Sequence, residues 1–194
     1  MANSRRKGHT FERGICRDLR EWLGRDWLVQ RNLDDDQTGA RGRAGDVLVS
    51  GPHLWPFSIE CKAGYRVRSS HLWKGSRTLE SHWRQTTDQA SAVELEPLLL
   101  LKPEETGHPV LVFLRRPVRR VLRIPGPAML VELQEETVAV SLWTRLLELE
   151  PVALLELALW IEDRRATPAE VAEEVAGALQ ELLPGPVSEY RSER

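Results

Sequence analysis

Residues 45–64 read GDVLVSGPHLWPFSIECKAG, and this stretch decides how the first half of the chain folds. It predicts two strands, over residues 45–50 and 57–62, because each apolar run has the length of a strand and is bounded by glycine or proline. The connection between them is short, so we expect the two strands to pair as a hairpin. Acidic residues stand at the start of the first strand and near the end of the second.

These acidic residues are the candidate chemical centre of the protein. Side chains alternate along a strand, so Glu60 and Lys62 share one face while Cys61 points the other way, into the core. Pairing of the two strands lets Asp46 reach the face of Glu60 and Lys62. Two carboxylates beside an amine describe a site for a divalent cation, and hard oxygen ligands suit Mg²⁺, with Mn²⁺ as a substitute. Lys62 would orient a water molecule or stabilise negative charge.

The rest of the chain predicts a mixed sheet flanked by helices. Thr10 is expected to cap a helix that ends at Gly24, after a loose basic arm over residues 1–8. Unbroken apolar runs predict central strands that are covered on both faces. The predicted helices span residues 10–23, 79–94 and 152–161, and a further helix is expected to start at 167–168. The further predicted strands span residues 27–31, 98–101 and 110–114, with an edge strand at 118–124 and one or two strands in 128–143.

Charge divides the chain into two parts. Residues 1–124 carry 22 Lys and Arg against 15 Asp and Glu, whereas residues 125–194 carry 5 against 14. We therefore expect a basic core domain over residues 1–124 that binds a polyanion such as nucleic acid. Residues 125–194 are expected to form an acidic, mostly helical C-terminal extension that packs on the core or on a dimer partner.

Composition excludes several classes of protein. The 29% of charged and 41% of hydrophobic residues are typical of a globular chain, and the longest apolar run is far too short to span a membrane. Two cysteines make no disulfide framework, and their spacing suggests no zinc site. We expect a cytoplasmic protein with no membrane partner.

The order of short motifs resembles the archaeal-type Holliday junction resolvases, Hjc, of the PD-(D/E)xK nuclease superfamily. The resemblance covers about residues 5–115. Its motifs are Arg6-Lys7-Gly8, Glu12-Arg13, Val29-Gln30-Arg31, Gly45-Asp46-Val47 and Ile59-Glu60-Cys61-Lys62.

The resemblance implies a restriction-endonuclease-like α/β core and a set of site residues. Asp46 and Glu60 would be the metal-binding acids and Lys62 the catalytic lysine, while Glu12 would complete the metal shell. Arg13 and Arg31 would contact phosphates. Members of the family act as homodimers that nick opposed strands of a four-way junction and leave 5′-phosphates. The proline expected before the aspartate is Gly45 here, and the loop at 33–44 is longer than expected.

Further basic residues predict contacts with the DNA backbone. A basic loop at 65–78 that also carries His71 and Trp73 is one candidate, and the basic N-terminal arm is another. The DNA-contacting side chains predicted from these two segments are Arg5, Arg6, Lys7, Arg66, Arg68, Lys74 and Arg77. Gln85 is expected to be an exposed helix residue, although related nucleases sometimes use a glutamine at this place. Asp34, Asp35 and Asp36 are expected to form a solvated acidic loop, with additional metal ligands as the alternative.

The sequence therefore predicts an Mg²⁺-dependent endodeoxyribonuclease that acts as a Holliday junction resolvase in DNA recombination and repair. One alternative is a phage or mobile-element nuclease of the same superfamily that cuts other branched or linear DNA, because fold does not determine substrate. A second is a non-catalytic DNA-binding protein, and a third is a purely structural partner protein.

Overall fold

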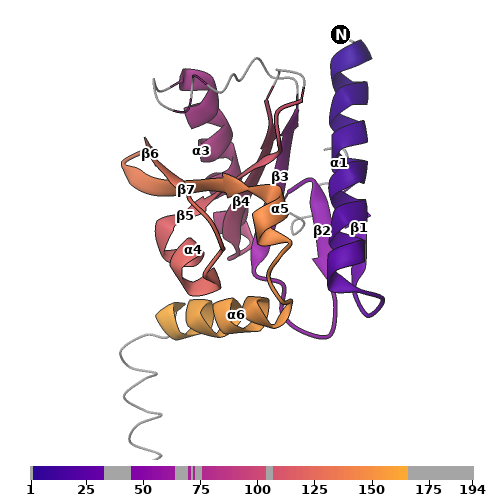
Figure 1. Ribbon diagram of the computed structural model, residues 1–194, viewed down its shortest axis with the longest axis vertical. Coiled ribbons are helices and arrows are strands. Elements are labelled where there is room, and N and C mark those ends of the chain that lie inside the picture. Colours follow the sequence, from indigo (N-terminus) through magenta and orange to yellow (C-terminus); the bar gives the residue numbers. More distant parts are fainter. Residues whose placement is uncertain are drawn as a thin grey trace, which may run out of the picture. The chain divides into compact units, whose positions relative to one another are not determined.

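The computed structural model describes residues 2–32, 45–63, 70, 72, 76–103 and 107–165, with the side chains of residues 2–5 left aside. Within this part of the chain, seven strands form one mixed sheet in the order β1-β2-β3-β4-β5-β7-β6 (Figure 1). The pair β3 and β4 is parallel, and the other neighbouring pairs are antiparallel. The strands are β1 (Leu28–Arg31), β2 (Val47–Ser50), β3 (Phe57–Ala63), β4 (Glu96–Lys102), β5 (Leu111–Arg115), β6 (Met129–Leu133) and β7 (Glu136–Leu142).

Helices cover both faces of this sheet. On one face, α3 packs over β3 and β4 and buries Trp83 against Leu99, Leu101 and Phe113. On the other face, α1 lies along β1 and β3, and α4 lies along β5 and β7. The helices are α1 (Ala2–Leu23), α3 (Arg77–Ala92), α4 (Arg116–Leu122), α5 (Trp143–Leu146) and α6 (Val152–Arg165). The expected α/β class, a mixed sheet flanked by helices with a helical C-terminal part, is confirmed.

The first helix is longer than expected. It begins at Ala2, so Thr10 is an interior residue and not a cap, and its hydroxyl donates to the carbonyl of Arg6 at 2.8 Å. The prediction of a loose arm over residues 1–8 is therefore wrong. The helix ends where expected, at Gly24, which adopts a left-handed φ of +82° that favours glycine.

The edge strand predicted at 118–124 is also wrong, because this segment forms α4. Val118 and Leu122 are its buried residues, one helical turn apart, and Pro117 occupies the first turn, where proline is tolerated. The remaining strands and helices that fall in described residues form close to their predicted positions. The predicted helix after 167–168 lies outside the described residues.

The sheet continues past the predicted domain boundary at residues 124 and 125. Strands β7 and β6 extend it beyond β5, with Val112 opposite Ser141 and Val131 opposite Val138. Residues Met1–Ala158 form one compact unit and Leu159–Arg194 a second. That residues 125–194 act as a separate extension stays a prediction. No helix of the described residues is long and apolar enough to cross a membrane.

Candidate active site

The site lies where β2 and β3 separate. Their pairing places Val47 opposite Ile59, and Asp46 comes directly before β2. The Asp46 amide donates to the carbonyl of Ile59 at 2.7 Å, and its Oδ2 accepts the amide of Cys61 at 2.7 Å. The Asp46 carboxylate thus accepts the hydrogen bond that the backbone of a further paired residue would otherwise accept from β3. This holds Asp46 against the open edge of β3, as the sequence predicted.

Gly45 makes this close approach possible. Its φ of +89° is in the left-handed region, and an added Cβ would lie 2.4 Å from the carbonyl oxygen of Ile59. Proline, which the superfamily pattern expects here, has φ near −65° and could not adopt this conformation. The departure from the pattern therefore has a local structural reason.

Glu60 and Lys62 are buried on the face of β3 that α3 covers. Lys62 Nζ contacts Glu60 Oε1, and the Gln85 side chain of α3 donates to the same oxygen at 3.0 Å. The other carboxylate oxygen, Oε2, is buried and has no hydrogen-bond partner among the described residues. One oxygen of Glu60 is thus fixed by two donors, while the second is left for a ligand.

Electrostatics at this site disfavour negative charge. The pKa of Glu60 is raised to about 7, first by burial and then by the charge of Asp46, while the charge of Lys62 and its hydrogen bond act in the opposite direction. Burial also raises the pKa of Asp46, against the hydrogen bond from the Cys61 amide. Cys61 is buried and free, and burial raises its thiol pKa well above the usual value. A bound cation would relieve the cost of two adjacent buried carboxylates.

Glu12 of α1 is near these acids but is engaged elsewhere. Its Oε2 accepts two bonds from Arg31 of β1, from Nε at 2.6 Å and from a terminal guanidinium nitrogen at 2.5 Å. Both side chains are largely buried, at 16% and 12% exposure. Glu12 still contributes to raising the pKa of Asp46 and of Glu60. The structure therefore brings Glu12 to the site, as an ion pair with a residue predicted to contact phosphate.

Helix α3 contributes two residues near the site, of which sequence reasoning missed His82. Gln85 is exposed, as expected, and its side chain also bonds Glu60. One helical turn earlier, His82 is half-buried, and its pKa is lowered to about 4 by burial and by the charge of Lys62. The spacing of three residues between His82 and Gln85 was the available signal, because it places both on one side of a helix.

Known proteins were compared with this chain. A family described as phage putative PDDEXK endonucleases matches residues 3–136. The chain belongs to this family. The crystal structure of Hjc from *Archaeoglobus fulgidus*, a Holliday junction resolvase from an archaeal hyperthermophile, is similar over 77% of this chain and 99% of that chain, with 13% identity and a TM-score of 0.37. No curated protein matches this chain.

Membership of the PDDEXK family implies a divalent metal, because such nucleases are typically metal-dependent. No group of three His, Cys, Asp or Glu side chains in the described ranges is arranged to hold an ion. Mg²⁺ does not need one, since it commonly takes one or two carboxylates and completes its shell with water and substrate phosphates. Asp46 and the unpartnered Oε2 of Glu60 fit that pattern. These two side chains would hold the ion.

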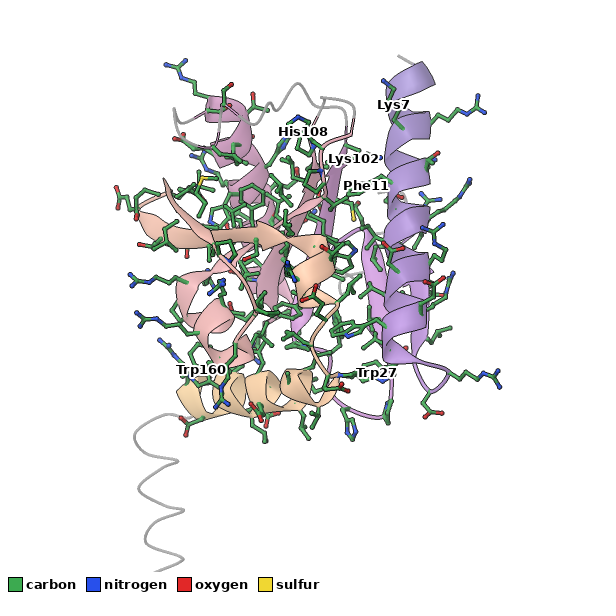
Figure 2. All side chains as sticks on the ribbon, viewed as in Figure 1. Lys7, Phe11, Trp27, Lys102, His108 and Trp160 are labelled. Atoms are coloured by element: carbon green, nitrogen blue, oxygen red, sulfur yellow. The ribbon has the colours of Figure 1, made fainter. Side chains whose placement is uncertain are left out.

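The predicted DNA-contacting residues are only partly described. Arg6, Lys7, Arg13 and Arg77 are exposed, and Figure 2 shows Lys7 near the N-terminal end of α1. The predicted residues that lie outside the described parts are the side chain of Arg5, then Arg66, Arg68, His71, Trp73, Lys74 and the acidic Asp34, Asp35 and Asp36.

Proposed function

We propose that this protein is a metal-dependent, structure-specific DNA endonuclease that resolves four-way junctions by phosphodiester hydrolysis and leaves 5′-phosphates. The observation that carries the hydrolytic part is the convergence of Asp46, Glu60 and Lys62 at the open edge of β3, with Oε2 of Glu60 left without a partner among the described residues. The order of motifs shared with the archaeal-type resolvases supports the junction as substrate, and with it a homodimer and a role in recombination and repair.

Each residue has a distinct task in this proposal. Asp46 and Glu60 would hold Mg²⁺, which would supply polarisation of the scissile phosphate and a lower pKa of the attacking water. Gln85 and Lys62 hold one oxygen of Glu60, which leaves the other without a donor among the described residues. Lys62 places a positive charge where negative charge develops on the phosphate. Mn²⁺ has the same preference for oxygen ligands and would substitute.

Nucleic acid as the partner is supported by charge. Residues 1–124 carry 22 basic against 15 acidic residues, and Arg13 is exposed on α1 one residue after Glu12. Cys16 and Cys61 are free thiols, which supports a reducing location inside the cell, where the DNA is.

A second candidate is a phage nuclease that cuts other branched or linear DNA. The family description favours it, because it names phage endonucleases and specifies no junction. A non-catalytic DNA-binding protein is disfavoured, because Asp46, Glu60 and Lys62 are all present and brought together.

The decisive experiment is a cleavage assay with Mg²⁺ on a labelled four-way junction and on a linear duplex of the same sequence. Lys62→Ala and Glu60→Gln are the inactive controls, and circular dichroism verifies that each is folded. Paired nicks in the junction alone, lost in both variants, support the resolvase. Equal cutting of both substrates supports the second candidate. Binding of DNA without metal-dependent cleavage would refute the nuclease.

A further inference from the structure

Helix α4 carries an arginine stripe that the proposed catalytic site does not use. Arg116 and Arg120 are four residues apart, so they lie on one side of the helix, and Arg123 follows directly as its C-cap. The opposite side is the buried one, formed by Val118 and Leu122. All three arginines are exposed. We call these three residues the α4 arginine stripe.

None of the three guanidinium groups has a hydrogen bond or an ion pair with any residue of the described ranges. The two other arginines of this segment are different. Arg119 donates to the carbonyls of Ile124 and Gly126, and Arg115 bonds the carboxylates of Glu96 and Glu136. Arg119 also donates to the Ser141 hydroxyl of β7 at 3.2 Å, and this bond ties α4 to the sheet. The stripe is thus a set of positive charges without a partner among the described residues, on a helix that is held in place.

Arg123 occupies a position that favours glycine. It caps the C-terminus of α4 with φ of 53° and ψ of 37°, in the left-handed region where a helix end most often has glycine. An arginine there adds strain to the backbone and adds nothing to the contacts of the fold.

The stripe is separate from the candidate active site. Arg115, just before α4, contacts Glu96, and Glu96 is level with Phe57 at the start of β3. From Arg115, Glu60 is two strands away across the sheet and three residues away along β3, which is roughly 10 Å in each direction. Arg115 thus lies roughly 14 Å from Glu60 within the plane of the sheet, and α4 lies on the face of the sheet opposite to α3.

We propose that the α4 arginine stripe binds the phosphate backbone of the DNA substrate at a place separate from the scissile phosphate. Arginine suits this partner because its planar guanidinium donates two parallel bonds to phosphate oxygens and is always charged. A rigid helix loses little freedom on binding. This inference rests on DNA being the substrate, as proposed above.

The test is the salt dependence of DNA binding, measured by fluorescence anisotropy on a labelled four-way junction in EDTA. Each phosphate contact contributes about 0.9 to the slope of log affinity against log salt. Arg116→Gln/Arg120→Gln is expected to reduce the slope by about 1.8, which is about a tenfold difference in salt sensitivity between about 50 and 200 mM KCl. The matched control, Arg25→Gln/Arg165→Gln, removes the same charge from exposed positions elsewhere and should keep the wild-type slope.

A second variant separates binding from folding. Arg123→Gly relieves the left-handed backbone, so it is expected to raise the melting temperature by about 2–4 °C while it reduces the salt slope by about 0.9. Gln134→Gly relieves a similar φ of 52° without changing charge, so it should stabilise the protein and leave the slope unchanged.

Equal slopes for wild type, Arg116→Gln/Arg120→Gln and the control would overturn the stripe as a DNA surface. If Mg²⁺-dependent cleavage persists in the wild type, that result leaves the proposed function standing. Wild-type protein that neither binds nor cuts DNA would overturn both proposals.

Discussion

Replacing Glu60 by glutamine should stabilise the protein at alkaline pH while it removes catalysis. Glutamine resembles the protonated carboxyl in shape and carries no charge, so it avoids the burial and the Asp46 repulsion that raise the pKa of Glu60 from 4.5 to about 7. One pKa unit corresponds to about 1.4 kcal/mol, so ionised Glu60 lowers the free energy of unfolding by about 3 kcal/mol. Solvent screens this electrostatic effect little, because Glu60 is only 2% exposed.

The pH dependence of this effect has a definite sign. Between pH 4.5 and 7 the folded state binds the Glu60 proton more tightly than the unfolded state, so wild-type stability falls with rising pH in that window. Above about pH 7 the loss of wild-type stability is complete, and it no longer changes with pH. The Glu60→Gln variant should therefore match wild type near pH 4.5 and exceed it by about 3 kcal/mol above pH 8.

Urea unfolding in EDTA, measured on either side of this window, tests the prediction. Glu21→Gln, at an exposed position of α1, is the matched control and should track the wild type at every pH. Saturating Mg²⁺ should then stabilise wild type by about 3 kcal/mol at a hundredfold excess over its Kd and leave Glu60→Gln nearly unchanged. A Glu60→Gln protein less stable than wild type above pH 8 would show that Glu60 is a structural partner of Lys62, and the reasoning would fail.

Two further predictions concern the residues around the site. Arg31→Gln leaves the buried Glu12 carboxylate without its partner, so the free energy of unfolding in EDTA should fall by about 2 kcal/mol. The increase in melting temperature on adding Mg²⁺ should then be larger than in wild type. An unchanged increase would show that Glu12 is no part of the metal shell. Gly45→Ala should cost about 3 kcal/mol or more and abolish stabilisation by Mg²⁺, because the new Cβ collides with the backbone of Ile59. Gly24→Ala, with a similar φ of +82° and open space around it, should cost only about 1 kcal/mol and retain the Mg²⁺ effect.

Local pattern was enough to locate the centre of the site. The alternation of side chains along β3 places Glu60 and Lys62 on one face, and the short connection to β2 brings Asp46 beside them. Local pattern failed for 118–124, where apolar residues are interspersed with three arginines in a way that is compatible with both a strand and a helix. Packing decides there, because the helix buries Val118 and Leu122 and leaves Arg120 exposed, whereas in a strand all three side chains would share one face.

The sequence by itself determined the two strands, the faces of their side chains and the family to which the motifs point. Only the tertiary structure decided that Gln85, which is 25 residues from Glu60, fixes one of its oxygens, and that Glu12 is paired with Arg31 from another element. The difference is that the first features are local along the chain, whereas these contacts join distant residues. Periodicity along a strand is set by the residue's own backbone, whereas a contact between a helix and a strand depends on how the two elements pack, which no local spacing encodes.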